Sequence, residues 1–443
     1  MLFDQDAYGH KPPAGGGGVS DDKPQGGSFW RGIARHPLSR LGPGLITGVA
    51  DDDPSGIATY SQAGAQFGLN MLWTMPLTFP LMATIQLMCA QIGRVTGKGL
   101  AANIKEAFPP SILKIIVVLV LIANTLNIAA DVAAMGEVAE LVTGLNRHAM
   151  TTAFVIGTLM LQVLIPYHIY VNYLKWLTLS LLAYAAILFT VYVPWMEVAA
   201  RTVWPHMSIT RASAMLVVGV FGTTISPYLF FWQASEEVED MRGAPSLLVN
   251  PAAAPAELRR MRWDTWSGMF YSNITAYFII LATAVTLYVS GIRDITTAAQ
   301  AASALRPLAG NFAFIVFALG ILGVGMIGVP VLAGSGGYAL CEAMNWSWGL
   351  ERKSADARGF YGVIAVSVLA GLAIQYSPIS PMKALVWSAV INGVVAVPLT
   401  AIITLLAGRR SVIGDFVIGK GYIALGWITT IIMGLAALAM FVL

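Results

Sequence analysis

The chain has 443 residues, of which 57% are hydrophobic and 11% are charged, and its formal net charge is +3. A mean hydropathy of +0.70 lies far outside the range of soluble domains, so we expect a polytopic membrane protein that contacts the lipid bilayer. The basic residues are spread along the whole chain and form no single patch with aromatic residues, which excludes nucleic acid as a partner.

The first residues differ in composition from the rest of the chain. Residues 1–41 contain a run of four glycines from Gly15 to Gly18, several prolines and few large apolar groups, which is typical of disorder. They lack the apolar stretch of a cleaved signal peptide, so the first membrane span is expected to act as the targeting signal. We therefore expect a disordered cytoplasmic tail over 1–41 and a transmembrane domain over 42–443.

Apolar runs of about twenty residues, the length needed to cross a bilayer as a helix, follow one another from residue 43 onward. We expect eleven spans, of which the first and the sixth are broken. The expected spans are 43–66, 69–93, 111–142, 149–167, 171–196, 213–236, 265–291, 312–344, 359–377, 382–407 and 419–442.

The basic residues distinguish the two sides of the membrane. If the N-terminus is cytoplasmic, the cytoplasmic loops hold most of them, among them Arg94, Arg259, Arg260, Arg262 and Arg409. This asymmetry follows the positive-inside rule and predicts a cytoplasmic N-terminus. A bacterial inner membrane and a plasma membrane fit this polarity equally well.

Three consecutive acids, Asp51, Asp52 and Asp53, stand inside the first apolar run and are followed by Pro54. A carboxylate at bilayer depth costs about 3 kcal/mol, so it persists mainly where it faces water or a bound cation. Pro54 removes a backbone donor and disfavours helix at Asp53, and Gly56 lets the chain leave helical geometry. We therefore expect two half-helices with carbonyl oxygens exposed beside the carboxylates, as in the discontinuous helices of secondary transporters.

The three acids are expected to have different roles. They cannot all be ionised at low cost because like charges repel, so binding of a divalent cation is expected to displace protons. Asp53 is the expected ligand of the ion. Asp52 and Asp51 have two readings: further ligands or part of a proton or cation pathway, and side chains that bond to neighbouring helices or face an aqueous vestibule.

A second interruption lies near the middle of the chain, where Ser226 and Pro227 stand inside the apolar run 213–236. A lone proline in a membrane helix is usually a tolerated kink, but this one mirrors the first break. Broken helices at the first and sixth positions are what a five-plus-five inverted repeat gives. We expect an all-α fold with repeat 1 over about 42–196, repeat 2 over about 213–407, and an extra helix at 419–442.

Two further polar features follow in the chain. The acidic run 236–240 closes the sixth span; it could attract exiting cations, but we favour a solvated helix end beside a basic loop. Asn273 and Asn392 lie inside later spans, where an amide either lends an oxygen to an ion or, more commonly, bonds a neighbouring helix.

Several motifs resemble those of the Nramp family of divalent-metal transporters. The strongest similarity lies in the first two spans, and it continues more weakly to the tenth span. The resemblance implies a leucine-transporter-like fold and inward transport of divalent metal, commonly with protons. The motifs are Gly42-Pro43-Gly44, Asp53-Pro54-Ser55-Gly56-Ile57-Ala58-Thr59, Gln62-Ala63-Gly64, Gln66-Phe67-Gly68, Leu72-Trp73, Thr96-Gly97-Lys98, Ala130-Asp131, the Ser226-Pro227 break and Ala384-Leu385-Val386.

The departures from the family pattern fall on the site itself. The first-helix motif of the family is Asp-Pro-Gly-Asn, and Gly56 stands where the metal-binding Asn is expected. The sixth-helix motif is Met-Pro-His with Ala three residues before the Met, and this chain has Thr223, Ser226 and Tyr228 at the Ala, Met and His positions. No thioether remains, and hydroxyl, carboxylate and carbonyl oxygens favour Mg²⁺, Ca²⁺ and Mn²⁺ over softer ions. We expect a hard-oxygen metal site of Asp53, Asp52, Gly56, Thr223 and Ser226 with backbone carbonyls.

The resemblance also bears on proton coupling, which in the family uses a pair of acids in the third helix and the His of the sixth. Asp131 is retained, whereas Ala134 replaces the second acid and Tyr228 replaces the His. We therefore expect facilitated, voltage-driven cation entry with weak or absent coupling. A proton or cation pathway through Asp51, Asp131 and Tyr228 is the alternative.

The expected function is that of a secondary transporter of divalent cations by alternating access, with Mg²⁺ or Mn²⁺ favoured and the metal as substrate. We expect no cofactor and no enzymatic activity, because no nucleotide-binding loop, nucleophile elbow or metalloprotease helix occurs. The alternatives are a proton-coupled symporter of transition metals, a transporter of an organic cation or amino acid on the same fold, and a sensor that does not transport. The sequence leaves open whether the protein is a monomer or a dimer.

Overall fold

The computed structural model describes residues 43–165, 169, 174, 177–241, 243–374 and 380–443, and no strand occurs among them. The expected disordered tail over 1–41 lies outside the described residues, as do parts of the spans expected at 149–167, 171–196 and 359–377. The helices are α2 (Pro43–Asp51), α3 (Pro54–Phe67), α4 (Thr74–Thr96), α5 (Leu100–Ala107), α6 (Pro110–Thr143), α7 (Arg147–Leu164), α9 (Leu182–Ala186), α10 (Trp195–Val203), α11 (Arg211–Thr224), α12 (Pro227–Asp240), α13 (Ala254–Thr283), α14 (Ala298–Ala302), α15 (Arg306–Ala309), α16 (Ala313–Met344), α17 (Arg358–Ile374), α18 (Pro381–Ala407), α19 (Arg410–Ile413) and α20 (Lys420–Val442).

Both predicted helix breaks are present. Asp52 and Asp53 separate α2 from α3, and Ile225 and Ser226 separate α11 from α12. In each case a proline occupies the first position of the second half-helix, where its missing N–H is not needed. The long runs predicted at 111–142 and 312–344 are continuous helices, α6 and α16.

Two predicted boundaries are wrong. The span expected at 265–291 begins earlier, at Ala254, so Arg259, Arg260 and Arg262 belong to α13 rather than to a loop. The span expected to run to 196 has no helix over 190–194, and α10 begins separately at Trp195. The first difference arises because charged residues extend α13 beyond the apolar stretch. In the second, the preceding helical turn ends at Phe189, and Pro194 stands directly before α10 as its N-cap.

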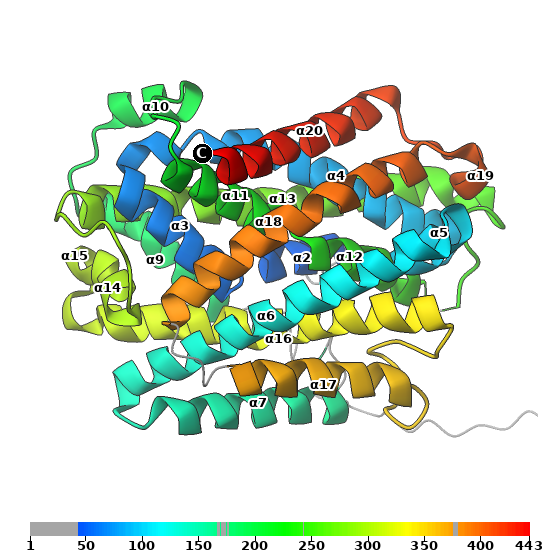
Figure 1. The fold of residues 1–443 in the computed structure, drawn as a ribbon, viewed down its shortest axis with the longest axis horizontal. Coiled ribbons are helices and arrows are strands. Elements are labelled where there is room, and N and C mark those ends of the chain that lie inside the picture. The colour runs from blue at the N-terminus through cyan, green and yellow to red at the C-terminus, as the bar shows by residue number, and fades with distance from the viewer. Residues whose placement is uncertain (1–42, 166–168, 170–173, 175–176, 242, 375–379) are drawn as a thin grey trace, which may run out of the picture. The chain divides into compact units, whose positions relative to one another are not determined.

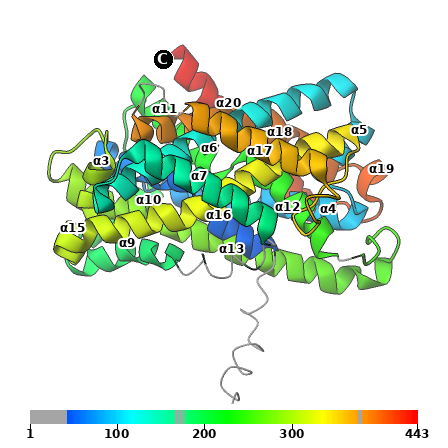
Figure 2. The ribbon, with the colours of Figure 1, turned by 90° about the horizontal axis from the view of Figure 1, so that it is seen from below.

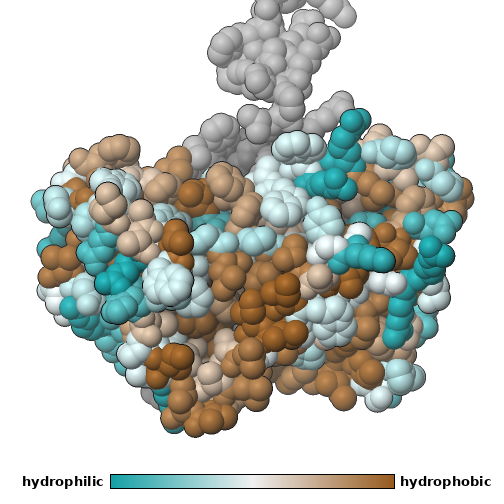
Figure 3. Space-filling model, turned by 90° about the horizontal axis from the view of Figure 1, so that it is seen from above, coloured by the Kyte–Doolittle hydropathy of each residue, from teal (hydrophilic) through white to brown (hydrophobic). Residues whose placement is uncertain are grey.

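Among the described residues, seven helical segments are long and apolar enough to cross a membrane. Their outward faces carry exposed apolar side chains, such as Ile431, Leu435 and Leu438 on α20. Figure 3 shows hydrophobic side chains across the middle of one face, with hydrophilic ones toward its two ends. The all-helical, membrane-spanning fold is thus confirmed, while the count of eleven spans stays a prediction.

The half-helices α2 and α12 lie near the centre of the helix bundle, and α3 leads from there toward the side on which α14 and α15 lie (Figure 1). The longer helices α6, α13, α16 and α18 pack around them, and α7 and α17 lie side by side on the outer side of α6 and α16 (Figure 2). The short helices α5 and α19 lie at one end of the spans, and α10, α14 and α15 lie at the other (Figure 1).

Glycines bring the helices around the breaks into backbone contact. A Cβ atom added to Gly222 of α11 would lie 2.1 Å from the carbonyl oxygen of Ala389 and 2.2 Å from the nitrogen of Gly393, both on α18. A Cβ added to Gly48 of α2 would lie 2.2 Å from the carbonyl oxygen of Gly268 on α13. Small residues at such crossings are typical of membrane helices, and here they let α11 lie directly on α18 and α2 lie directly on α13.

Candidate functional site

The first break is organised by Asp53, which is 1% exposed and forms the N-cap of α3. Its Oδ1 accepts hydrogen bonds from the backbone N–H of Gly56 at 2.8 Å and from the hydroxyl of Ser55 at 2.6 Å. An N-cap carboxylate satisfies a helix N–H that has no partner within the helix. These two bonds fix the carboxylate at the point where the chain leaves helical geometry.

The second oxygen of Asp53 faces two other helices. Oδ2 accepts a hydrogen bond from Asn127 Nδ2 on α6 at 2.8 Å. The hydroxyl of Tyr228, at the start of α12, lies 3.3 Å from the same oxygen and 3.1 Å from the carbonyl oxygen of Ala50. Asp53 therefore joins α3, α6 and α12, and all of its donors are neutral groups.

Asp51 and Asp52 have a different environment, since both contact Ser272 of α13. The Ser272 hydroxyl faces Oδ2 of Asp51 and Oδ1 of Asp52, the latter at 3.1 Å. Within the described part of the chain, Asp51 Oδ1 and Asp52 Oδ2 are fully buried and have no hydrogen-bond partner. The two acids bond a neighbouring helix, as one of the two sequence readings expected, and each keeps one oxygen for another group.

The second break lies close to Gly56. A Cβ atom at Gly56 would be 3.0 Å from Thr223 Oγ1, 3.3 Å from the ring of Tyr60 and 3.5 Å from the carbonyl oxygen of Asp51. The hydroxyl of Ser226 faces the carbonyl oxygens of Gly222 and Thr223, at 2.9 and 2.7 Å. Thr223 is thus beside the first break, whereas the Ser226 hydroxyl bonds to the end of its own helix. The absence of a side chain at Gly56 leaves room between the two breaks.

Asp131 and α16 complete the surroundings of Asp53. Asp131 on α6 is 0% exposed and lies near both Asp53 and the backbone of Ser55 at the start of α3. Asn127 lies one turn before it on the same helix. A Cβ at Gly328 of α16 would lie 3.2 Å from Asp53 Cβ, so α16 closes this side of the break tightly.

The three adjacent acids do not converge on one point. Among the residues that the structure describes, no group of three His, Cys, Asp or Glu side chains is arranged to hold a metal ion. Asp51 and Asp52 face Ser272, whereas Asp53 faces Asn127 and Tyr228. The site that the geometry allows is therefore one carboxylate surrounded by neutral oxygens, with Asp52 nearby.

Two residues of this site, Asn127 and Ser272, were not predicted from the sequence. Neither belongs to a motif, and each lies in an apolar helix where a single polar residue is common. Asn273, the amide in α13 that the sequence suggested as a possible ligand, faces Thr78 and Met82 of α4 instead. The sequence shows that Asn127 and Ser272 are polar, but only the packing of α6 and α13 shows which acids they contact.

Asn127→Ala is expected to weaken cation binding by about tenfold to hundredfold, because it removes a hydrogen bond to a charged group, a contribution of about 1.5–3 kcal/mol. Calorimetric titration of the purified protein with Mn²⁺ measures this change. Asn124→Ala is the matched control, since Asn124 lies one turn away and donates to Leu332 and Ser335 of α16 rather than to Asp53. Equal losses in both variants would contradict the role given to Asn127.

The acidic run 236–240 at the end of α12 is not simply a solvated helix end. Glu237 is 0% exposed and forms an ion pair with Arg260, so that expectation is wrong for this residue. Glu239 accepts hydrogen bonds from Tyr338 and from the backbone N–H groups of Leu350 and Glu351. This end of α12 is buried because α13 and the segment after α16 cover it, a packing contact that the local sequence does not indicate.

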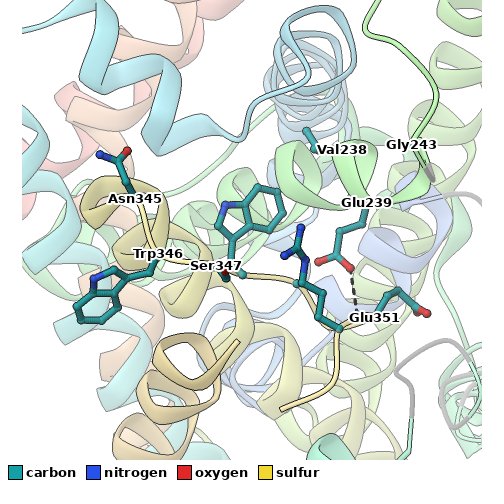
Figure 4. Close-up of a pocket in the computed structure, with 10 residues that line it drawn as sticks. Val238, Glu239, Gly243, Asn345, Trp346, Ser347 and Glu351 are labelled. Carbon is teal, nitrogen blue, oxygen red and sulfur yellow. Dashed lines mark hydrogen bonds between the residues drawn. The ribbon is translucent and has the colours of Figure 1, made fainter. Parts of the chain in front are cut away.

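Glu239 also borders a pocket of about 490 Å³, which lies at the opposite end of α12 from Ser226. Figure 4 shows Glu239 reaching toward Glu351 across this pocket, with Trp346 and Asn345 on another side. None of the residues that line it belongs to either helix break. The pocket is therefore separate from the site around Asp53.

Two broken membrane helices that meet at a buried carboxylate are the architecture of a secondary transporter. The family model described as natural resistance-associated macrophage protein-like, Nramp, matches residues 44–443. The chain belongs to the Nramp family, which confirms the resemblance seen in the sequence. It is an integral membrane protein of a transporter family and not an enzyme.

Relatives and solved structures agree with this assignment. The divalent metal cation transporter MntH of Acidiphilium cryptum is 26% identical over 432 residues, which cover 94% of this chain and 92% of that protein. MntH of Pectobacterium carotovorum is 26% identical and covers 89% of this chain and 92% of its own length.

The fold is similar to that of the manganese transporter of Eremococcus coleocola, with a TM-score of 0.71, 17% identity, and coverage of 94% of this chain and 88% of that one. MhsT, solved in complex with L-phenylalanine, gives a TM-score of 0.56 with 14% identity and coverage of 91% and 98%. At these identities the likeness concerns the fold, and it confirms the leucine-transporter-like architecture.

Proposed function

We propose that this protein carries divalent metal cations across the membrane by alternating access, with the ion bound at the break between α2 and α3. One observation carries the proposal: Asp51, Asp52 and Asp53 are at most 1% exposed, and no Lys, Arg or His of the described residues forms an ion pair with them. Buried carboxylates without a cationic partner are costly, and a bound metal ion supplies that partner. The relatives named as divalent metal cation transporters support the same cargo.

The potential ligand atoms around Asp53 favour a hard metal ion. Asp53, Thr223, Asn127 and the backbone carbonyls of the two breaks offer oxygen, and no thioether stands at position 226. Oxygen ligands suit Mg²⁺, Ca²⁺ and Mn²⁺, and Mg²⁺ in particular keeps several waters when bound. We therefore assign Mg²⁺ or Mn²⁺ as the substrate, with Asp52 and Gly56 bordering the ion and Ser226 shaping the end of α11. The metal is cargo, and no resident cofactor enters the proposal.

Transport without obligatory proton coupling fits the residues at hand. Tyr228 replaces an imidazole and donates its hydrogen bond toward Asp53, and Ala134 offers no second acid beside Asp131. Proton symport is the second candidate, because Asp131 is a fully buried acid that lies near Asp53. Recording internal pH during uptake separates the two. We place the protein in a bacterial inner membrane or a plasma membrane with its N-terminus in the cytoplasm.

Ser226→Met is expected to shift the preference toward soft ions, raising Cd²⁺ affinity relative to Mg²⁺ by roughly an order of magnitude, because a thioether favours softer metals. Competition by Cd²⁺ and by Mg²⁺ against Mn²⁺ uptake into dye-loaded proteoliposomes measures the shift, and it tests the hard-site proposal at the same time. Ser226→Leu is the control of similar size without sulfur. A wild-type protein that already prefers Cd²⁺, or one inhibited only by organic amines, would contradict the proposal.

A further inference from the structure

Polar side chains continue from the site along the contact of α2, α12 and α13. Thr47 of α2 lies one turn before Asp51 and donates a hydrogen bond to Gln233 Oε1 of α12 at 2.6 Å. Gln233 Nε2 in turn lies 3.4 Å from Oε1 of Glu237, one turn further along α12. We call Thr47, Gln233, Glu237 and Arg260 the inner seam. It forms a row of polar groups from the first break toward the end of α12.

The seam is closed in this structure because α2 lies directly on α13. The backbone N–H of Gly44 donates to Asp264 Oδ2 at 2.7 Å. A Cβ at Gly44 would be 2.7 Å from the nitrogen of Thr265, and one at Gly48 would be 2.2 Å from the carbonyl oxygen of Gly268. With no side chain between the two backbones, no ion can pass unless α2 separates from α13.

Glu237 provides the fully buried carboxylate of the inner seam. It is 0% exposed, and its Oε2 lies 2.9 Å from Arg260 Nη2 of α13. Arg260, whose side chain is 36% exposed, also contacts Glu257 at 3.4 Å and Asp240 at 3.9 Å. Among the described residues, Arg260 is the only cation paired with Glu237, and it has two other acids within reach nearer to solvent.

We propose that Glu237 is a second cation-binding carboxylate, through which the ion passes after leaving Asp53, and that the Arg260 guanidinium occupies it while the seam is closed. This inference rests on the proposed function. Burying two opposite charges contributes little net stability, because the cost of desolvating them offsets most of their attraction. A role in stabilising the fold therefore does not by itself explain why Glu237 and Arg260 are an ion pair. A carboxylate beside amide and hydroxyl oxygens suits a divalent cation, and Arg260 can turn to Asp240 and Glu257 when the ion arrives.

The decisive test exchanges the two charges. The double variant Glu237→Arg/Arg260→Glu keeps an ion pair but places a cation on the α12 side of the seam. The proposal expects Mn²⁺ uptake into proteoliposomes to fall at least about tenfold, while calorimetric Mn²⁺ binding at Asp53 is retained. A purely structural pair predicts wild-type uptake in the exchanged protein, and that result would overturn the inference.

The single variant Glu237→Gln decides the matter if the exchanged protein does not fold. Lower turnover with unchanged Mn²⁺ affinity and melting temperature supports the relay role, whereas a lower melting temperature with normal turnover per folded molecule overturns it. Glu342→Gln is the matched control, since Glu342 is a buried acid that bonds Ser235 and Ala102 away from the seam. Failure of the proposed function would show as no saturable uptake by the wild-type protein, before any variant is compared.

Discussion

Asp53→Ala is expected to abolish saturable cation uptake. The substitution removes the carboxylate that receives donors from α3, α6 and α12, and with it the charge that a divalent ion requires at this depth. Asp52 does not replace it, because its carboxylate faces Ser272 instead. Asp53→Asn, which keeps the shape but not the charge, is expected to show a loss nearly as large.

Initial rates of Mn²⁺ entry into proteoliposomes, together with calorimetric binding to the purified protein, measure this effect. Glu342→Gln serves as the control for loss of a buried carboxylate elsewhere, and its melting temperature shows how much of any loss is due to folding. Saturable uptake by Asp53→Ala at the wild-type rate would remove Asp53 from the site.

Gly222→Ala is expected to destabilise the protein by about 1–3 kcal/mol, the usual cost of inserting a group into a well-packed contact. The added Cβ would lie 2.1 Å from the carbonyl oxygen of Ala389, so α11 and α18 must separate. Because Thr223 is the next residue and Ser226 lies four residues after Gly222, the second break moves with α11, and cation affinity falls as well.

Thermal unfolding in detergent, followed by tryptophan fluorescence, measures the change in melting temperature. Gly157→Ala on α7 is the matched control, because a Cβ there meets nothing within 4 Å. This control is expected to change stability by no more than about 1 kcal/mol, in the stabilising direction. If Gly222→Ala had the same melting temperature as the wild type, α11 and α18 would not be held in close contact.

Local chemistry made both helix breaks predictable. Pro54 and Pro227 cannot continue a helix with normal hydrogen bonding, so both breaks followed from the sequence. An acid inside an apolar run is costly unless it has a function, so the importance of Asp53 followed as well. Position 56 needed a small residue for a reason visible only in three dimensions, namely its contact with Thr223 and Tyr60.

Long-range contacts were not predictable in the same way. Ser272 is more than two hundred residues from Asp51, and nothing in its neighbourhood indicates that it holds two acids. Likewise, the pairing of Glu237 with Arg260 depends on α13 beginning at Ala254, which hydropathy alone placed in a loop. Single polar residues in apolar helices acquire their roles from the neighbour that packing provides.

The most direct test of the central claim is Mg²⁺ and Mn²⁺ entry into proteoliposomes under an inside-negative potential, with internal pH recorded in the same vesicles. We predict saturable entry of both ions in the wild-type protein, without acidification, and none in Asp53→Ala. No flux of either ion in the wild type, or equal flux in both proteins, would contradict an ion site at the α2–α3 break.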